Sequence, residues 1–242
     1  MEKTYNFSAG PGVLPDEVIT QIKQEFERNE HTHMSIIEIS HRSAQFQAIV
    51  TEAEQKLREL MAIPEDYAVI FLQGGGSTQF EMIPLNFATN QSHIAILDSG
   101  NFAAKASEAA EMLGKQATVL NSTKGINYQK LPILPEHFDP ELYDYLHIVT
   151  NNTIEGTTFH QDNLPSTTGR LVADMSSNIL AEPYDINAFD AVFAGGQKNL
   201  GPAGVTVAII KKDWLAQQDV RHVGPMMRYQ NHIDKQSMYN TS

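Results

Sequence analysis

Cysteine is absent from the 242-residue sequence, which excludes a disulfide framework, a thiolate metal site and a catalytic cysteine. Basic residues are scarce as well, because 17 lysines and arginines stand against 29 aspartates and glutamates, for a net charge of -12. A field of that sign repels a polyphosphate backbone, and the sequence has no local basic patch. We therefore expect no nucleic-acid partner.

Long apolar runs are also missing. The N-terminal segment MEKTYNFSAGPG has no apolar signal core, and no run approaches the roughly 20 apolar residues of a membrane span. The nine histidines are scattered, and the close pair His31 and His33 has a spacing that fits neither one helix face nor a metal signature. These absences predict a cytoplasmic protein with no membrane contact and no metal site.

The sequence does contain a repeated pattern of apolar and polar segments. A short apolar run is followed by polar or glycine residues and then by a stretch with helical spacing, which is typical of α/β units on a mostly parallel sheet. The predicted strands lie at 68–72, 94–97, 146–149, 171–173 and 191–194, and the predicted helices after the first two strands lie at 79–88 and 101–113. The pattern predicts an α/β fold whose central sheet is flanked by helices.

Further segments complete this outline. Helical spacing covers 16–29 and 43–61, and Pro15 before Asp16 suits a helix start. The β-rich run at 205–210 is a candidate for an additional strand at the edge of the sheet. The stretch 128–144 contains three prolines and is interpreted as a surface connection.

Ligands in open α/β sheets bind beyond the carboxyl ends of the strands, so the residues after each apolar run are the first candidates for chemistry. Lys198 follows Ala194 by four residues, after two glycines and before a turn-rich segment. A buried lysine loses its proton more readily and can condense with the aldehyde of pyridoxal 5'-phosphate (PLP). An exposed lysine on an ordinary turn fits this segment equally well.

Asp174 also follows a predicted strand. A carboxylate at that place can keep a pyridine nitrogen protonated, which lets the ring accept electrons from a substrate. Its position at a strand-to-helix turn equally suits a helix N-cap.

Three weaker signals accompany these two residues. The glycine-rich turn at 74–78 opens a helix, where free N–H groups favour a phosphate, but it is neither a P-loop nor GxGxxG. Phe102 can stack on a flat ring, although an aromatic residue at a helix start more often belongs to the core. Arg42 can clamp an anion, although a surface arginine is the more usual case.

Five motifs together resemble one family. They are YNFSAGPGVLP at 5–15, SHRS at 40–43, the GGG turn, ADMSSN at 173–178 and GGQKNLGPAG at 195–204. They resemble the phosphoserine aminotransferases, which are fold-type I PLP-dependent transferases. The similarity runs the whole length of the chain, and the last two motifs at this spacing carry most of its specificity.

The resemblance implies transfer of an amino group between L-glutamate and 3-phosphohydroxypyruvate, giving 2-oxoglutarate and phosphoserine, with a second possible role in vitamin B6 biosynthesis. It implies that Lys198 is the Schiff-base lysine and the catalytic acid and base. It also implies that Asp174 is the partner of the pyridine nitrogen.

Further roles follow only from the resemblance. Gly76 and Ser77 correspond to cofactor-phosphate residues, Phe102 to the ring-stacking residue, and Thr153 and Gln197 to polar cofactor contacts. Asn240 and Thr241 correspond to residues that complete the site of the partner subunit in a homodimer, and His41 and Arg42 to the substrate-binding motif. Phe102 stands where many relatives have tryptophan, and Ser77 where they have arginine, so one charge on the phosphate is missing.

The ends of the chain give a further expectation. Residues 1–15 correspond to the N-terminal part of the family's small domain and 16–242 to its PLP-binding large domain. The sequence stops within the YNTS segment, so we expect the C-terminal remainder of the small domain, with further substrate arginines, to be absent and transamination by this chain to be impaired. Two alternatives stay open, an aminotransferase of serine–pyruvate type and a non-catalytic PLP-binding or dimerisation fragment.

Overall fold

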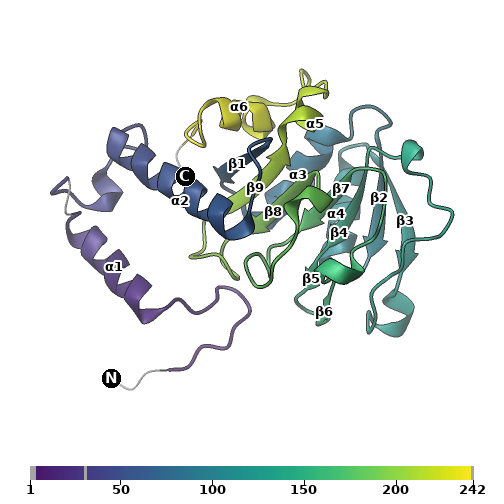
Figure 1. Cartoon of the computed structure of the whole chain (residues 1–242), viewed down its shortest axis with the longest axis horizontal. Coiled ribbons are helices and arrows are strands. Elements are labelled where there is room, and N and C mark those ends of the chain that lie inside the picture. The colour runs from purple at the N-terminus through teal and green to yellow at the C-terminus, as the bar shows by residue number, and fades with distance from the viewer. Residues whose placement is uncertain (1–3, 30–31, 241–242) are drawn as a thin grey trace.

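The computed structural model describes residues 4–29 and 32–240, and a seven-stranded sheet forms the centre of this part of the chain. The strand order is β1-β9-β8-β7-β4-β2-β3 (Figure 1). The strands of the sheet are β1 (Tyr67–Leu72), β2 (His93–Asp98), β3 (Gln116–Ser122), β4 (Tyr145–Val149), β7 (Leu171–Asp174), β8 (Ala191–Gly195) and β9 (Thr206–Lys211). A separate short ribbon pairs β5 (Asn151–Asn152) with β6 (Thr157–Thr158).

The helices that accompany the sheet are α1 (Asp16–Glu27), α2 (Ala44–Met61), α3 (Gly75–Phe87), α4 (Asn101–Met112), α5 (Lys212–Ala216) and α6 (Tyr229–Asp234). The predicted α/β class is confirmed, since β3, β2, β4, β7 and β8 pair in parallel. The predicted helices are confirmed as well, with α3 starting four residues earlier than the sequence indicated.

One strand assignment was wrong. The run at 205–210 does form a strand, β9, but β9 lies between β1 and β8 and pairs antiparallel with both. Residues 206–210 are all buried, as expected for a strand with neighbours on either side. The edge next to β2 is instead formed by β3, whose side chains are largely exposed.

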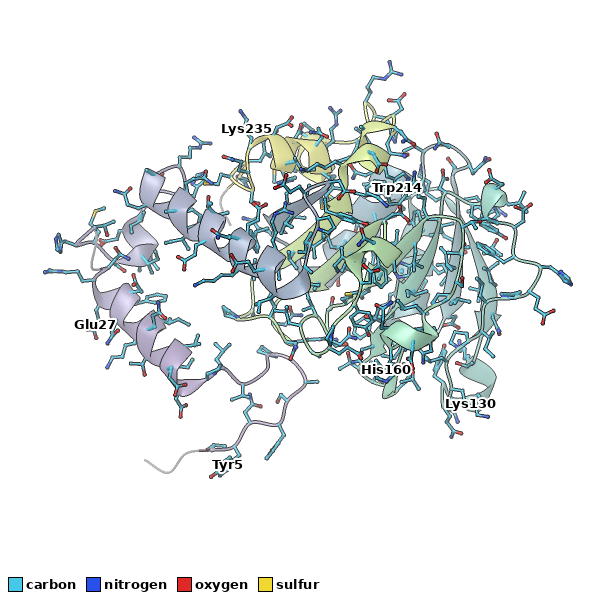
Figure 2. All side chains as sticks on the ribbon, viewed as in Figure 1. Tyr5, Glu27, Lys130, His160, Trp214 and Lys235 are labelled. Carbon is cyan, nitrogen blue, oxygen red and sulfur yellow. The ribbon has the colours of Figure 1, made fainter. Side chains whose placement is uncertain are left out.

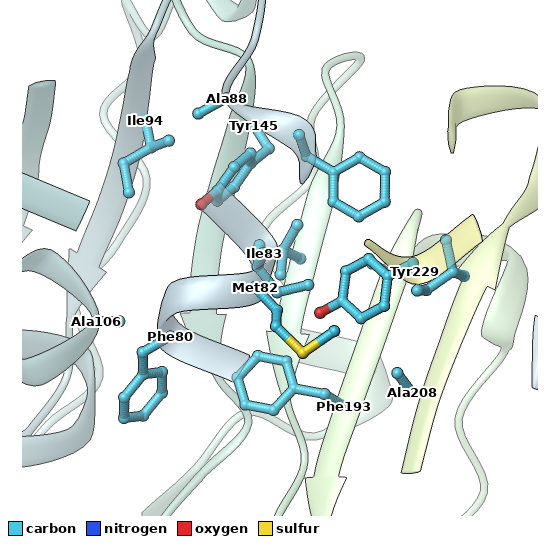
Figure 3. Close-up of a cluster of buried hydrophobic side chains, with 14 of the residues drawn as sticks. Phe80, Met82, Ile83, Ala88, Ile94, Ala106, Tyr145, Phe193, Ala208 and Tyr229 are labelled. Atoms are coloured by element: carbon cyan, nitrogen blue, oxygen red, sulfur yellow. The ribbon is translucent and has the colours of Figure 1, made fainter. Parts of the chain in front are cut away.

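Alternate side chains of each central strand pack on opposite faces of the sheet. In β8, Phe193 points toward the cluster formed with α3, α4 and α5, whereas Val192 points toward the cluster that includes Leu57 of α2. Figure 3 shows the first cluster, with Phe80, Ile83, Tyr145 and Phe193 gathered around α3. This two-sided burial explains the nearly continuous apolar runs in the sequence.

The N-terminal part of the chain is much less buried than the sheet. Ser43 caps α2 by accepting the Phe46 N–H, and α2 packs its C-terminal end on the sheet through Leu57. By contrast α1 buries none of its side chains, and Figure 1 shows it standing away from the sheet. Figure 2 shows Tyr5 at the outside of the segment that leads to α1.

The stretch 128–144 contains no strand and runs over the surface as predicted, with part of its apolar side chains tucked against the core. Across the described ranges, no helix is both long enough and apolar enough to cross a membrane.

Candidate active site

The carboxyl ends of β1, β2, β4, β7 and β8 meet at one edge of the sheet, because these five strands run in the same direction. Each strand is followed there by a turn or a helix start. The polar residues that follow separate strands in the sequence are therefore brought to a single edge, which is where α/β folds bind ligands.

Lys198 lies in the loop that follows β8 and is half-buried. Its Nζ donates a hydrogen bond to Thr153 Oγ1 at 2.6 Å and lies 4.6 Å from the centre of the Phe102 ring. Burial lowers the pKa of the Lys198 ammonium, and the charge of Asp174 partly opposes that shift. Thus the structure brings together three residues that the sequence analysis had selected, from the loop after β8, from α4 and from the turn between β5 and β6.

Asp174 ends β7 and is 4% exposed. Burial raises the pKa of its carboxyl group, while hydrogen bonds from Ser176 and the charge of Lys198 lower it. Its Oδ1 accepts the Ser176 N–H at 2.9 Å, and the residues that follow form turns rather than a helix. The helix-cap interpretation is therefore wrong for Asp174, whose carboxylate interacts electrostatically with the Lys198 ammonium.

The glycine turn begins α3. Gly74 and Gly75 have φ of 88° and 68°, in the left-handed region that favours glycine, and α3 starts at Gly75. Gly76 and Ser77 lie in its first turn, with Ser77 exposed. A Cβ on Gly76 would come within 3.2 Å of Ser176 Oγ, so the start of α3 lies directly against the turn after β7.

Sequence reasoning missed Ser176. Its Oγ accepts the Gly195 N–H at 3.0 Å and so joins the ends of β7 and β8. The neighbouring Ser177 accepts from Asn151 Nδ2 at 2.8 Å, and Asn178 accepts from Thr150 Oγ1 at 2.7 Å. These bonds fix the turn after β7 to the segment that carries Thr153. The signal was present, because all three residues belong to the ADMSSN motif in which only the aspartate had been singled out.

The N-terminal arm, residues 4–15, reaches the same loop. The Gly12 N–H donates to the Gln197 carbonyl at 2.8 Å. A Cβ on Gly12 would lie 2.6 Å from the Lys198 carbonyl oxygen, and one on Gly10 would lie 3.0 Å from Lys198 Cγ. The two glycines of the SAGPG segment therefore allow the arm to lie directly on the lysine loop.

Replacing Gly12 with alanine should detach the arm from this loop. The added methyl group would overlap a backbone oxygen and break the bond to Gln197, which is expected to lower the free energy of unfolding by about 1 kcal/mol. Limited proteolysis within residues 4–15, together with urea unfolding, measures the effect. Gly125→Ala is the matched control, since a Cβ on Gly125 meets nothing within 4 Å, and equal behaviour of the two variants would contradict the prediction.

Other candidates are not brought to Lys198 by any interaction in the described ranges. Arg42 is exposed in the turn before α2, and His41 has a buried Nε2 without a hydrogen-bond partner among the described residues. Asn240 is exposed and lines a cavity of about 300 Å³ beside Gly74 and Thr78. Thr241 lies outside the described residues.

Two further observations limit what the site can be. In residues 4–29 and 32–240, no group of three or more histidines, aspartates or glutamates could hold a metal ion. A cavity of about 640 Å³ lies between the loops 131–140 and 163–168, but none of the residues described above lines it. Neither observation adds a residue to the group that lies around Lys198.

The family model for class-V aminotransferases matches residues 4–242, and the chain belongs to that family.

The relatives that resemble this chain have names more specific than that of the family. A phosphoserine aminotransferase of Leuconostoc mesenteroides is 68% identical over 98% of this chain and 66% of its own length. One from Lactobacillus helveticus is 48% identical, with 63% of its length covered. The solved phosphoserine aminotransferase of Bacillus circulans subsp. alkalophilus superposes with a TM-score of 0.92 at 42% identity, over 100% of this chain and 66% of that one. The chain thus spans slightly less than two thirds of the length of these relatives.

Proposed function

We propose that this chain carries the PLP site of a phosphoserine aminotransferase, which moves an amino group between L-glutamate and 3-phosphohydroxypyruvate. The observation that carries the proposal is the position of the Lys198 amine. It contacts the Phe102 ring and the Thr153 hydroxyl, and it interacts electrostatically with the buried carboxylate of Asp174. The named relatives support the choice of substrates.

The residues present fit the parts of PLP. A primary amine suits its aldehyde, a buried carboxylate suits its pyridine nitrogen, and an aromatic face suits its ring. The start of α3 offers free N–H groups for its phosphate, and Gly76 and Ser77 are the residues that would hold it. Gln197 and Thr153 supply further polar groups beside the lysine. When bound, PLP supplies an electron sink for the substrate's Cα–H bond.

Lys198 is suited to move a proton. Because burial lowers the pKa of its ammonium, the neutral amine is more accessible than in a surface lysine. The Thr153 hydroxyl accepts one N–H of Nζ and thereby orients it. The neutral amine can then act as nucleophile toward an aldehyde and as base toward a substrate carbon acid.

Asp174 is suited to hold a proton on a ring nitrogen. Burial disfavours an isolated carboxylate, as the raised pKa of Asp174 indicates. A protonated pyridine nitrogen would add a favourable charge for this buried carboxylate, beyond the hydrogen bonds from Ser176 and the charge of Lys198. In that pairing Asp174 stays ionised and keeps the ring cationic.

The domain division and the dimer are part of the same proposal. Residues 1–15 would belong to the small domain and 16–242 to the large one. The N-terminal region exposes apolar side chains, with Tyr5, Phe7 and Ile37 at 77%, 93% and 70% exposure, which favours burial against another surface. In the homodimer, Asn240 and Thr241 would complete the partner's phosphate site, and His41 and Arg42 would bind the substrate's anionic groups.

The central test is the absorption spectrum of the chain with added PLP. We expect a visible band from lysine-bound PLP in the wild type and its loss in Lys198→Ala, because the attaching amine is removed. Lys235→Ala, an exposed lysine on the C-terminal side (Figure 2), is the control and should keep the band.

An unchanged band in Lys198→Ala would overturn the assignment of the lysine. Substrate choice needs a separate measurement, in which 3-phosphohydroxypyruvate and pyruvate compete for the amino group of glutamate. We expect the phosphorylated acceptor to be preferred, and a preference for pyruvate would favour an aminotransferase of serine–pyruvate type.

A further inference from the structure

Glu155 lies two residues after Thr153, at the turn between β5 and β6. Its Oε1 accepts the N–H of Asn101, the first residue of α4, at 2.9 Å. The N-cap of α4 is Gly100, which has no side chain with which to satisfy the free N–H groups of the helix. A carboxylate from a separate segment therefore caps α4, and its negative charge also suits the positive end of the helix dipole.

Gly100 leaves the space that this carboxylate occupies. A Cβ at position 100 would lie 2.6 Å from Glu155 Oε2 and 2.9 Å from Oε1. The backbone at Gly100 is extended, with φ of 163°, a conformation that any residue can adopt. Position 100 therefore needs glycine because a Cβ would overlap the Glu155 carboxylate, and not because of its backbone conformation.

The two segments that Glu155 joins are those that hold Lys198. Phe102, one residue into α4, presents its ring 4.6 Å from Lys198 Nζ. Thr153, on the same turn as Glu155, accepts the hydrogen bond from that nitrogen at 2.6 Å. One carboxylate therefore connects the aromatic face and the hydroxyl that flank the amine.

We infer that Glu155 is a positioning residue: by capping α4, it keeps both the Phe102 ring and the Thr153 hydroxyl in contact with the Lys198 amine. The effect on cofactor binding rests on the proposed function. The capping of α4 does not, so the two can be tested separately.

Three variants test this role. Glu155→Ala removes the cap, Glu155→Gln keeps an oxygen acceptor without the charge, and Gly100→Ala fills the space of the carboxylate. The control is Asp185→Ala, which also removes a carboxylate that accepts a backbone N–H at a helix start. Asp185 precedes β8 and so lies at the opposite edge of the sheet from Lys198.

The first readout is PLP affinity, measured by titrating the visible band. Loss of a helix cap should weaken binding about fivefold in Glu155→Ala and in Gly100→Ala, with Glu155→Gln within about twofold of wild type. The pH dependence of the band reports the pKa of the Lys198 nitrogen. This pKa should fall in Glu155→Ala, because a displaced Phe102 ring no longer stabilises the protonated, cationic form of that nitrogen. It should stay at the wild-type value in Glu155→Gln and Asp185→Ala.

The second readout is hydrogen exchange of the backbone in residues 99–106, measured without PLP. Exchange should be faster in Glu155→Ala and Gly100→Ala than in wild type and in Asp185→Ala. Unchanged exchange in both variants, or equal loss of PLP affinity in Asp185→Ala, would overturn the inference. If the wild type shows no band that Lys198→Ala abolishes, the proposed function fails, and the exchange experiment still decides whether Glu155 caps α4.

Discussion

Phe193→Ala is expected to lower the free energy of unfolding by about 3–5 kcal/mol, the range for truncating a buried phenylalanine. Phe193 is fully buried in β8. Its ring lies edge-on to Phe80, at 5.9 Å between centroids, and stacks on His147 at 6.2 Å. Figure 3 shows the ring below α3, where removal would leave a cavity between helix and sheet.

Urea unfolding followed by circular dichroism measures this loss. Ile133→Ala is the control, because Ile133 is 77% exposed and should change the free energy of unfolding by no more than about 0.5 kcal/mol. The Phe193 ring also lies 3.9 Å from where a Cβ on Gly76 would stand, so PLP affinity should fall with stability. A loss of no more than about 1 kcal/mol in the free energy of unfolding would contradict the prediction. Such a loss is about one third of the smallest expected loss, and it would show that the surrounding side chains fill the cavity at little cost.

His147→Phe is expected to remove an acid sensitivity of the fold worth about 3 kcal/mol. His147 is buried in β4 against the rings of Phe80 and Phe193, and burial lowers its pKa to about 4. In the unfolded chain the imidazole has a pKa of about 6.5. Between these values the unfolded chain binds a proton that the folded one refuses, so stability is present above about pH 6.5 and is lost as the pH falls toward about 4.

The measurement is the free energy of unfolding at several pH values from 7 to 4. The carboxylates contribute equally in both proteins, so the difference between wild type and His147→Phe isolates the imidazole. His137→Gln, a change at an exposed histidine, should keep the wild-type slope. Identical slopes for wild type and His147→Phe would contradict the prediction, because they would mean that the folded chain binds the imidazole proton as readily as the unfolded chain.

The strands that the sequence predicted share one property, which is burial on both faces. β2, β4, β7 and β8 are continuous apolar runs and could be recognised as such. β3 was missed because QATVLNS lies at an edge with mostly exposed or half-buried side chains, and so lacks that pattern. The interior position of β9 depends on pairing with β1, far away in the sequence, which local apolar content does not specify.

The residues of the candidate site likewise fall into those that the local sequence predicts and those that depend on contacts between distant segments. Asp174 ends a strand, and Lys198 and the glycine turn follow strands, so the topology alone brings them to the same edge of the sheet. Glu155 escaped notice because its partner, Asn101, is 54 residues away and the glutamate follows no strand of the main sheet. Arg42 is exposed in the turn before α2, which agrees with the more usual case of a surface arginine, and its local residues did not decide between that case and an anion clamp.

The antiparallel direction of β9 has a consequence for the lysine loop. Gly195 at the end of β8 pairs with Thr206 at the start of β9, and the Gly196 N–H bonds to the Val205 carbonyl at 2.8 Å. Residues 196–205 therefore leave and re-enter the sheet at neighbouring points, as a short closed loop. Its ends cannot separate unless two central strands unpair, so the chain pays the entropy of placing Lys198 when the sheet forms and not when a ligand arrives.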